Sequence, residues 1–95
     1  MLHILNKPPH SDAAQQMLST VMAGDSILLI EDAVQAVLHQ EWLGWKANGT
    51  QVLVLEEDAE SRGLLPGAST VKATWVNMEG FVTLTEQNVK ILSWY

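Results

Sequence analysis

The amino-acid sequence predicts an α/β protein built on a mainly parallel sheet of about five strands. Five short apolar segments alternate with segments in which apolar residues recur at helical spacing. One of the apolar segments, SILLIE, is apolar at consecutive positions, which is typical of a strand covered on both faces. With 95 residues, 47% of them hydrophobic, the chain is long enough to form one packed domain, residues 1–95.

The first strand is predicted at residues 2–6, and it ends at a Pro-Pro pair that cannot continue inside a sheet. Residues 12–23 form the first predicted helix, because their apolar side chains fall on one stripe. Asp12 is followed three residues later by a glutamine, as in a capping box, and is predicted as the N-cap. Gly24 suits the position just past the helix end.

The second predicted strand, residues 26–31, leads into a helix at residues 33–40. Asp32 stands directly before this helix and is predicted as its N-cap. A less regular segment, residues 41–49, then leads to the third predicted strand at residues 51–56.

The second half of the chain repeats this alternation. Asp58 is predicted to cap a short helix at residues 59–62, which Gly63 ends with Leu64 as its apolar contact. Residues 64–69 contain a Pro-Gly turn signal and are predicted as a loop.

A fourth strand is predicted at residues 71–76 and a fifth at residues 89–94. Between them, Asn77 is predicted to cap a helix at residues 78–87.

Two interpretations exist for the Glu31-Asp32 pair, because ligands bind at the carboxyl ends of strands in open α/β sheets. The pair is either part of such a site or the ordinary start of a helix. A capping residue recurs at the corresponding places, Asp12, Asp58 and Asn77, and one device used at four helix starts favours capping. Glu31 is less constrained by this argument and is left as a candidate for contact with a partner.

Composition excludes several classes of function. The net charge of −6, with only five basic residues, argues against a nucleic-acid-binding surface. The absence of cysteine excludes disulfides, thiolate metal sites and thiol catalysis. No apolar run approaches the length of about 20 residues that crosses a bilayer, and no leader pattern opens the chain, so a soluble, cytoplasmic protein is expected.

Motifs for nucleotides, phosphoryl transfer and metals are likewise missing. No glycine-rich phosphate loop follows the first strand, and no acid stands there as a phosphoacceptor domain requires. His3, His10 and His39 do not form the i, i+4 pair of a metal-binding helix face. We therefore predict no catalytic, cofactor-binding or metal-ligating residue and no cofactor.

Tryptophan is abundant, with four residues in 95. Trp42 and Trp45 lie in the irregular segment after the second helix, and aromatic residues are enriched in the cores of interfaces. Core packing and a subunit interface explain this pair about equally well, and we expect them at or near a subunit contact. Trp75, in the middle of the fourth strand, is expected in the core.

Several segments together resemble the TusB/DsrH family of sulfur-relay proteins. They are MLHILNK at the start, GDSILLIEDAV through the second strand, EEDAESRGL after the third, and FVTLT with a late tryptophan. The resemblance covers essentially the whole chain. The length and the D-x-x-x-R-G-L spacing from Asp58 to Leu64 favour the TusB branch.

This resemblance implies a Rossmann-like three-layer α/β/α sandwich and a cytoplasmic sulfur relay. It implies TusC-like and TusD-like partners in a heterohexamer with two copies of each subunit. Such a complex passes persulfide sulfur toward the 2-thiolation of the wobble uridine of tRNA, which this subunit would meet only through the complex. Because the chain lacks the relay cysteine of some members, the resemblance implies an accessory subunit without catalytic activity of its own.

Two alternatives remain beside this function. The chain is either a DsrH-like subunit of a DsrEFH sulfur-oxidation complex, or a stand-alone small α/β enzyme or regulator that uses the acids at the strand ends. Genome context separates the first alternative from the relay, and association with partners separates the second.

Overall fold

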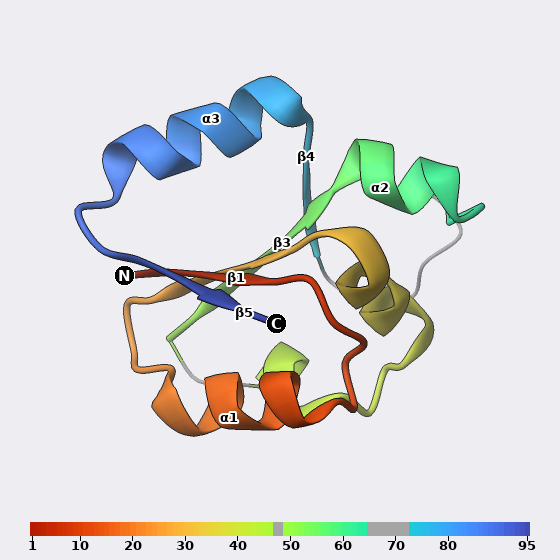
Figure 1. Cartoon of the computed structure of the whole chain (residues 1–95), viewed down its shortest axis with the longest axis horizontal. Coiled ribbons are helices and arrows are strands. Elements are labelled where there is room, and N and C mark those ends of the chain that lie inside the picture. The colour runs from red at the N-terminus through yellow and green to blue at the C-terminus, as the bar shows by residue number, and fades with distance from the viewer. Residues whose placement is uncertain (47–48, 65–72) are drawn as a thin grey trace.

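The computed structural model describes residues 1–46, 49–64 and 73–95 and confirms the predicted α/β fold with a parallel sheet (Figure 1). Its strands are β1 (Leu2–Leu5), β2 (Ser26–Leu29), β3 (Gln51–Leu55), β4 (Thr74–Val76) and β5 (Ile91–Trp94). They form one five-stranded sheet in the order β4-β3-β2-β1-β5, with every neighbouring pair parallel. Residues 71–72 of the predicted fourth strand and residues 65–69 of the predicted loop lie outside the described residues.

The helical segments are α1 (Asp12–Thr20), η1 (Glu31–Leu38), η2 (Leu43–Lys46), α2 (Glu56–Ser61) and α3 (Met78–Gln87). The prediction of an α-helix at residues 33–40 is wrong in type and bounds, because η1 is a 3₁₀ helix that begins two residues earlier. Its ends show the tighter i to i−3 bonds, from the N–H of Ala33 to Ile30 and from that of His39 to Ala36.

The strand order explains how the helices are distributed over the two faces of the sheet. Crossovers between parallel strands are right-handed, so connections that advance in one direction lie on one face. The steps from β1 to β2, β3 and β4 all advance in one direction, and the step from β4 to β5 reverses it. Of the described helices, α3 therefore lies on the opposite face from α1 (Figure 1).

The face toward α1 carries the larger hydrophobic core, which we call the closed face. Its strand side chains alternate with those of the other face, as the pleat of a sheet requires. The buried residues of this core are Leu5, Ala14, Met17, Ile27, Leu29, Ala33, Val34, Ala36, Val37, Trp42, Val52, Val54 and Ala59. Trp75 packs against this core, as the sequence predicts.

The face toward α3 has a smaller core of three buried leucines, Leu2, Leu28 and Leu53. Phe81 and Leu84 of α3 pack against them, three residues apart on one side of the helix. Among the described residues, no side chain of α3 is fully buried.

The start of one helix and the end of another lie at the capping residues that the sequence predicts. Asn77 caps α3, since its side chain accepts the Gly80 N–H at 2.9 Å. Gly63 ends α2 with a φ of 73°, and the Leu64 N–H returns to the Ala59 carbonyl at 2.8 Å, which is a Schellman motif.

The prediction that Asp12 caps the first helix is wrong. Ser11 is the N-cap of α1, and its hydroxyl accepts the Ala14 N–H at 3.2 Å, while Asp12 is already in the first turn. The helix also ends at Thr20, earlier than residue 23, so Gly24 lies in the following turn with a φ of 92°.

Candidate functional site

The acids after β2 and β3 meet at the carboxyl end of the sheet, where a ligand site would be expected. Glu31 follows β2 closely and has a φ of 49°, a left-handed conformation that side chains disfavour. Its N–H donates to the Asp58 carboxylate at 2.6 Å. Because Glu31 is the first residue of η1, Asp58 caps η1 from another part of the chain.

Glu57, the residue before Asp58, does the same for α3. Its carboxylate accepts the backbone N–H of Met78, the first residue of α3, at 2.9 Å. Two consecutive acids of α2 thus hold the starts of two other helices, one on each face of the sheet. The predicted role of Asp58 as the cap of its own helix is wrong, because α2 already begins at Glu56.

Asp32 is not an N-cap either, because it lies inside η1, whose N-cap residue Ile30 makes no side-chain cap bond. The Asp32 carboxylate instead pairs with the Arg62 guanidinium at 3.1 Å. Arg62 also donates to the Asp58 backbone carbonyl at 3.2 Å. These contacts join Asp58 and Arg62 of the D-x-x-x-R-G-L motif to the Glu31 backbone and the Asp32 carboxylate, so the Asp32 and Asp58 carboxylates serve the fold. The Glu31 side chain is exposed, and its contact with a partner stays a prediction.

The two tryptophans predicted at a subunit contact lie side by side, with ring centroids 5.5 Å apart and nearly perpendicular planes. Trp42 is only 3% exposed and belongs to the closed-face core, so core packing accounts for this ring, and its position near a subunit contact stays a prediction. A Cβ on Gly44 would overlap the Trp42 ring, which explains a glycine at that position. Trp45 is half-buried and donates its indole N–H toward the carbonyls of Ala36 and His39.

A small pocket of about 130 Å³ lies between the start of α1 and the segment before η2. His10 and His39 meet edge to face with centroids 5.1 Å apart, and His39 contacts Glu41 at 3.3 Å. A hydrogen bond from its own backbone N–H, together with His39, lowers the pKa of Glu41. The pocket is lined by Pro9, His10, Gln15, Leu18, Glu41, Trp42 and Leu43.

Over the residues that the structure describes, no three histidine, aspartate or glutamate side chains are grouped to hold a metal ion. His10 and Glu41 line the pocket, and His39 contacts both of them from outside its lining. No nucleophile was predicted beside His10, and the sequence offers no cysteine to supply one.

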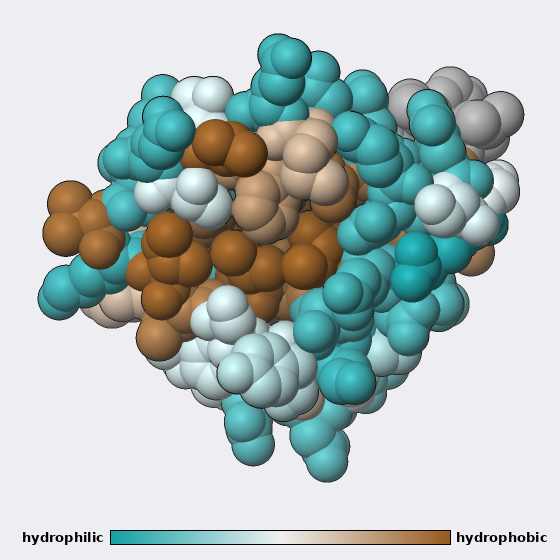
Figure 2. Space-filling view, turned by 45° about the horizontal axis from the view of Figure 1, so that its top comes forward, coloured by the Kyte–Doolittle hydropathy of each residue, from teal (hydrophilic) through white to brown (hydrophobic). Residues whose placement is uncertain are grey.

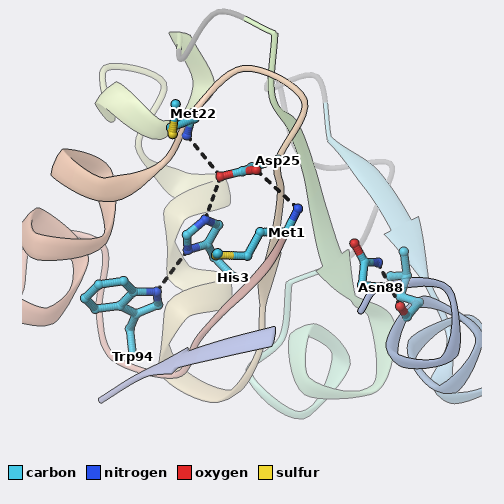
Figure 3. A network of polar contacts seen from close by, with 7 residues as sticks. Met1, His3, Met22, Asp25, Asn88 and Trp94 are labelled. Carbon is cyan, nitrogen blue, oxygen red and sulfur yellow. Dashed lines mark hydrogen bonds and ion pairs between the residues drawn. The ribbon is translucent and has the colours of Figure 1, made fainter. Parts of the chain in front are cut away.

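A polar network at the amino end of the sheet was not predicted. Figure 3 shows the Asp25 carboxylate placed between the His3 ring, the Met22 N–H and the terminal amine of Met1. The distances are 2.9 Å to His3 Nε2, 3.0 Å to Met22 N and 3.2 Å to Met1 N. These partners, His3 first, lower the pKa of Asp25 from 3.8 to about 2.

The far side of the His3 ring fixes its protonation pattern. Its Nδ1 lies 3.1 Å from Trp94 Nε1, and an indole N–H only donates (Figure 3). Nδ1 therefore accepts, and Nε2 carries the proton that it donates to Asp25. His3 is fully buried, and the network joins β1, β5 and the start of β2. A lone histidine in an apolar strand was the only sequence signal for it.

Comparison with known proteins gives a consistent result over the whole chain. The family model described as "DsrH like protein" matches residues 7–91. Protein TusB of Cronobacter sakazakii is 32% identical over 96 aligned residues, which cover 99% of this chain and 100% of that protein. Protein TusB of Erwinia tasmaniensis and of Serratia proteamaculans are each 34% identical over 99 aligned residues, with the same coverage.

Among solved structures, the solution NMR structure of a Thermotoga maritima protein has the same fold, with a TM-score of 0.69. It covers 95% of this chain and 97% of that one at 23% sequence identity. Within the described residues, no helix has both the length and the apolar character needed to cross a membrane.

Proposed function

The chain belongs to the DsrH-like family, and from this membership we propose that it is a non-catalytic subunit of a TusBCD-like sulfur relay. The relay would pass persulfide sulfur toward 2-thiolation of the wobble uridine of tRNA. The observation that carries this proposal is the end-to-end match with proteins named TusB at 32–34% identity.

The chemistry of the chain supports the accessory role. A persulfide is carried on a thiolate, and the sequence contains no cysteine. At the carboxyl end of the sheet, the Asp58 and Glu57 carboxylates accept N–H groups at helix starts and the Asp32 carboxylate pairs with Arg62, so these three acids are accounted for as structural groups. The subunit would contribute shape and contact surface, and a partner would hold the sulfur.

The proposal includes a cytoplasmic heterohexamer with two copies each of this chain, a TusC-like and a TusD-like subunit. The net charge of −6 supports contact with tRNA only through the complex, since a lone acidic subunit repels phosphates. Native mass spectrometry of the co-expressed subunits measures the composition directly.

Gene deletion with complementation tests the function. We expect wobble 2-thiouridine, measured by mass spectrometry of digested tRNA, to disappear in the deletion strain and to return with the wild-type gene. Thiolation that persists in the deletion strain would contradict the proposal. Incubation of the isolated chain with a cysteine desulfurase and cysteine is the matched control, and no persulfide mass is expected on it.

The family model itself favours one second candidate, a DsrH-like subunit of a sulfur-oxidation complex, because its description names DsrH. Sulfite reductase genes near this gene, together with unchanged tRNA thiolation after its deletion, would favour that function.

A further inference from the structure

The face of the sheet beneath α3 is only partly covered. Figure 2 shows apolar side chains gathered between α3 and β5, and we call this surface the open face. It is made of Ile4, Ile30, Met78, Phe81, Val82 and Ile91. Ile91 is 40% exposed, Val82 48% and Met78 49%.

The residues come from two elements that present one surface. Ile91 pairs with Leu2 in the parallel register, so it points to the same side of the sheet as Leu2 and Ile4. Met78, Phe81 and Val82 are spaced i, i+3 and i+4 and form one stripe of α3.

An all-parallel sheet is normally covered on both faces, and exposed contiguous apolar patches mark interaction sites. The single chain reversal places only α3 of the described helices over this face. A further chain is therefore needed to complete the cover.

The charged residues around the open face indicate what kind of protein chain would bind there. The neighbouring helices carry Glu56 and Glu60 on α2 and Glu79 and Glu86 on α3, together with the capping acids Glu57 and Asp58 of α2. Neither helix has a basic residue, and the six acids outnumber the exposed Lys90 that precedes Ile91. Hydrophilic side chains adjoin the apolar patch in Figure 2. Nearby, Arg62 is already paired with Asp32.

A second copy of this chain would bring the same acidic border to the contact, because a two-fold dimer joins identical patches. Each copy carries a net charge of −6, so the two would repel. A partner with lysine or arginine around an apolar centre removes this penalty and adds attraction.

We propose that the open face docks a different protein subunit, whose contact surface has an apolar centre and a basic border. This inference rests on the proposed function, because it identifies the partner as another subunit of the relay complex. It also predicts that assembly weakens as the salt concentration rises, since border charges are screened.

The test uses the full chain and the purified TusC-like and TusD-like subunits of the same organism. Val82→Glu places a charge on the open face at an exposed helix position, where glutamate is a good helix former. Leu38→Glu is the matched control, because Leu38 is 65% exposed at the end of η1, away from the open face. Thermal melts of both variants verify that each is folded.

We expect Val82→Glu to weaken assembly by about tenfold or more, and Leu38→Glu to change it by less than about twofold. The charge reversal Glu79→Lys should weaken assembly and flatten its salt dependence. Wild-type affinity in Val82→Glu overturns the inference, as does a wild-type homodimer that Val82→Glu dissociates. If the wild-type chain forms no complex with the subunits, the proposed function fails, and the docking inference fails with it.

Discussion

The two faces of the sheet are built from the same strands but are completed differently. Leu28 and Leu29, neighbours on β2, point to opposite faces and are both fully buried. Farther out, Leu5 and Trp94 on the closed face are buried and half-buried, and Ile4 on the open face is half-buried. The edge strand β5 is exposed on both sides, with Leu92 on the closed side 39% and Ile91 on the open side 40% exposed. Inside this edge, α1, η1 and α2 contribute buried residues to the closed face, and of the described helices only α3 covers the open face.

This difference teaches that coverage follows topology more than hydrophobicity. Both faces have apolar strands, but three successive crossovers cover one face and the single reversal covers the other. Stability is therefore expected to depend on the closed face, and assembly on the open face.

The largest effect is expected from Trp42→Ala on the closed face. Removing this buried indole leaves a cavity and should lower the free energy of unfolding by about 3–5 kcal/mol. Phe81→Ala on the open face, where the ring is half-buried, should cost about 1–2 kcal/mol. Urea unfolding measures both, and equal losses would break the comparison.

Trp42→Phe serves as the control for ring volume. The Trp42 Nε1 is buried without a hydrogen-bond partner among the described residues, so its removal sacrifices no bond. Trp42→Phe should therefore lower the free energy of unfolding by much less than Trp42→Ala does.

The next effect concerns the Asp25 network, which closes the amino end of the sheet. Because the folded pKa of Asp25, about 2, lies below its ordinary 3.8, its stabilisation is complete above about pH 4. It is lost as the pH falls toward 2. Asp25→Asn should lower stability at pH 7 by about 1.5 kcal/mol, the scale of a hydrogen bond to a charged group.

Thermal melts of wild type and Asp25→Asn between pH 2 and 7 check this. The two curves should converge at the acid end. A constant gap across the whole range would show that the carboxylate charge is not responsible.

A smaller effect separates the two consecutive acids of α2. Asp58→Ala removes the acceptor of the first N–H of η1, which has no side-chain cap of its own, and should cost about 1 kcal/mol. Glu57→Ala removes the corresponding acceptor for α3, but Asn77 still caps that helix, so about 0.5 kcal/mol or less is expected.

Denaturant titration compares the two variants, with Asp32→Ala as a surface reference. Asp32 makes an exposed ion pair with Arg62, so Asp32→Ala should lower the free energy of unfolding by less than about 0.5 kcal/mol. A larger loss in Glu57→Ala than in Asp58→Ala would reverse the expected order.

The smallest effect has the opposite sign. Glu31 adopts a φ of 49°, which glycine reaches without steric cost. Glu31→Gly should raise the free energy of unfolding by about 0.5 kcal/mol, after the greater freedom of glycine in the unfolded chain is subtracted. Glu31→Ala, which keeps the Cβ, should show no gain in the same titration.

The sequence by itself determined what local chemistry controls. Apolar runs between breakers located all five strands, and the Asn77 and Gly63 signals placed the start of α3 and the end of α2. These features depend on a few neighbouring residues, so periodicity and turn chemistry are sufficient to find them. Four sequence segments also indicated membership of the TusB/DsrH family, and the end-to-end matches confirm it.

Only the tertiary structure decided which residues meet across the chain. Asp32 and Asp58 have the local pattern of N-caps, but Asp32 bonds Arg62 and Asp58 bonds Glu31, partners 30 and 27 residues away. Trp42 is buried because Gly44 and the closed-face core enclose it. The strand order, and with it the open face, depends on non-local pairing, and local patterns carry no information about which strands become neighbours.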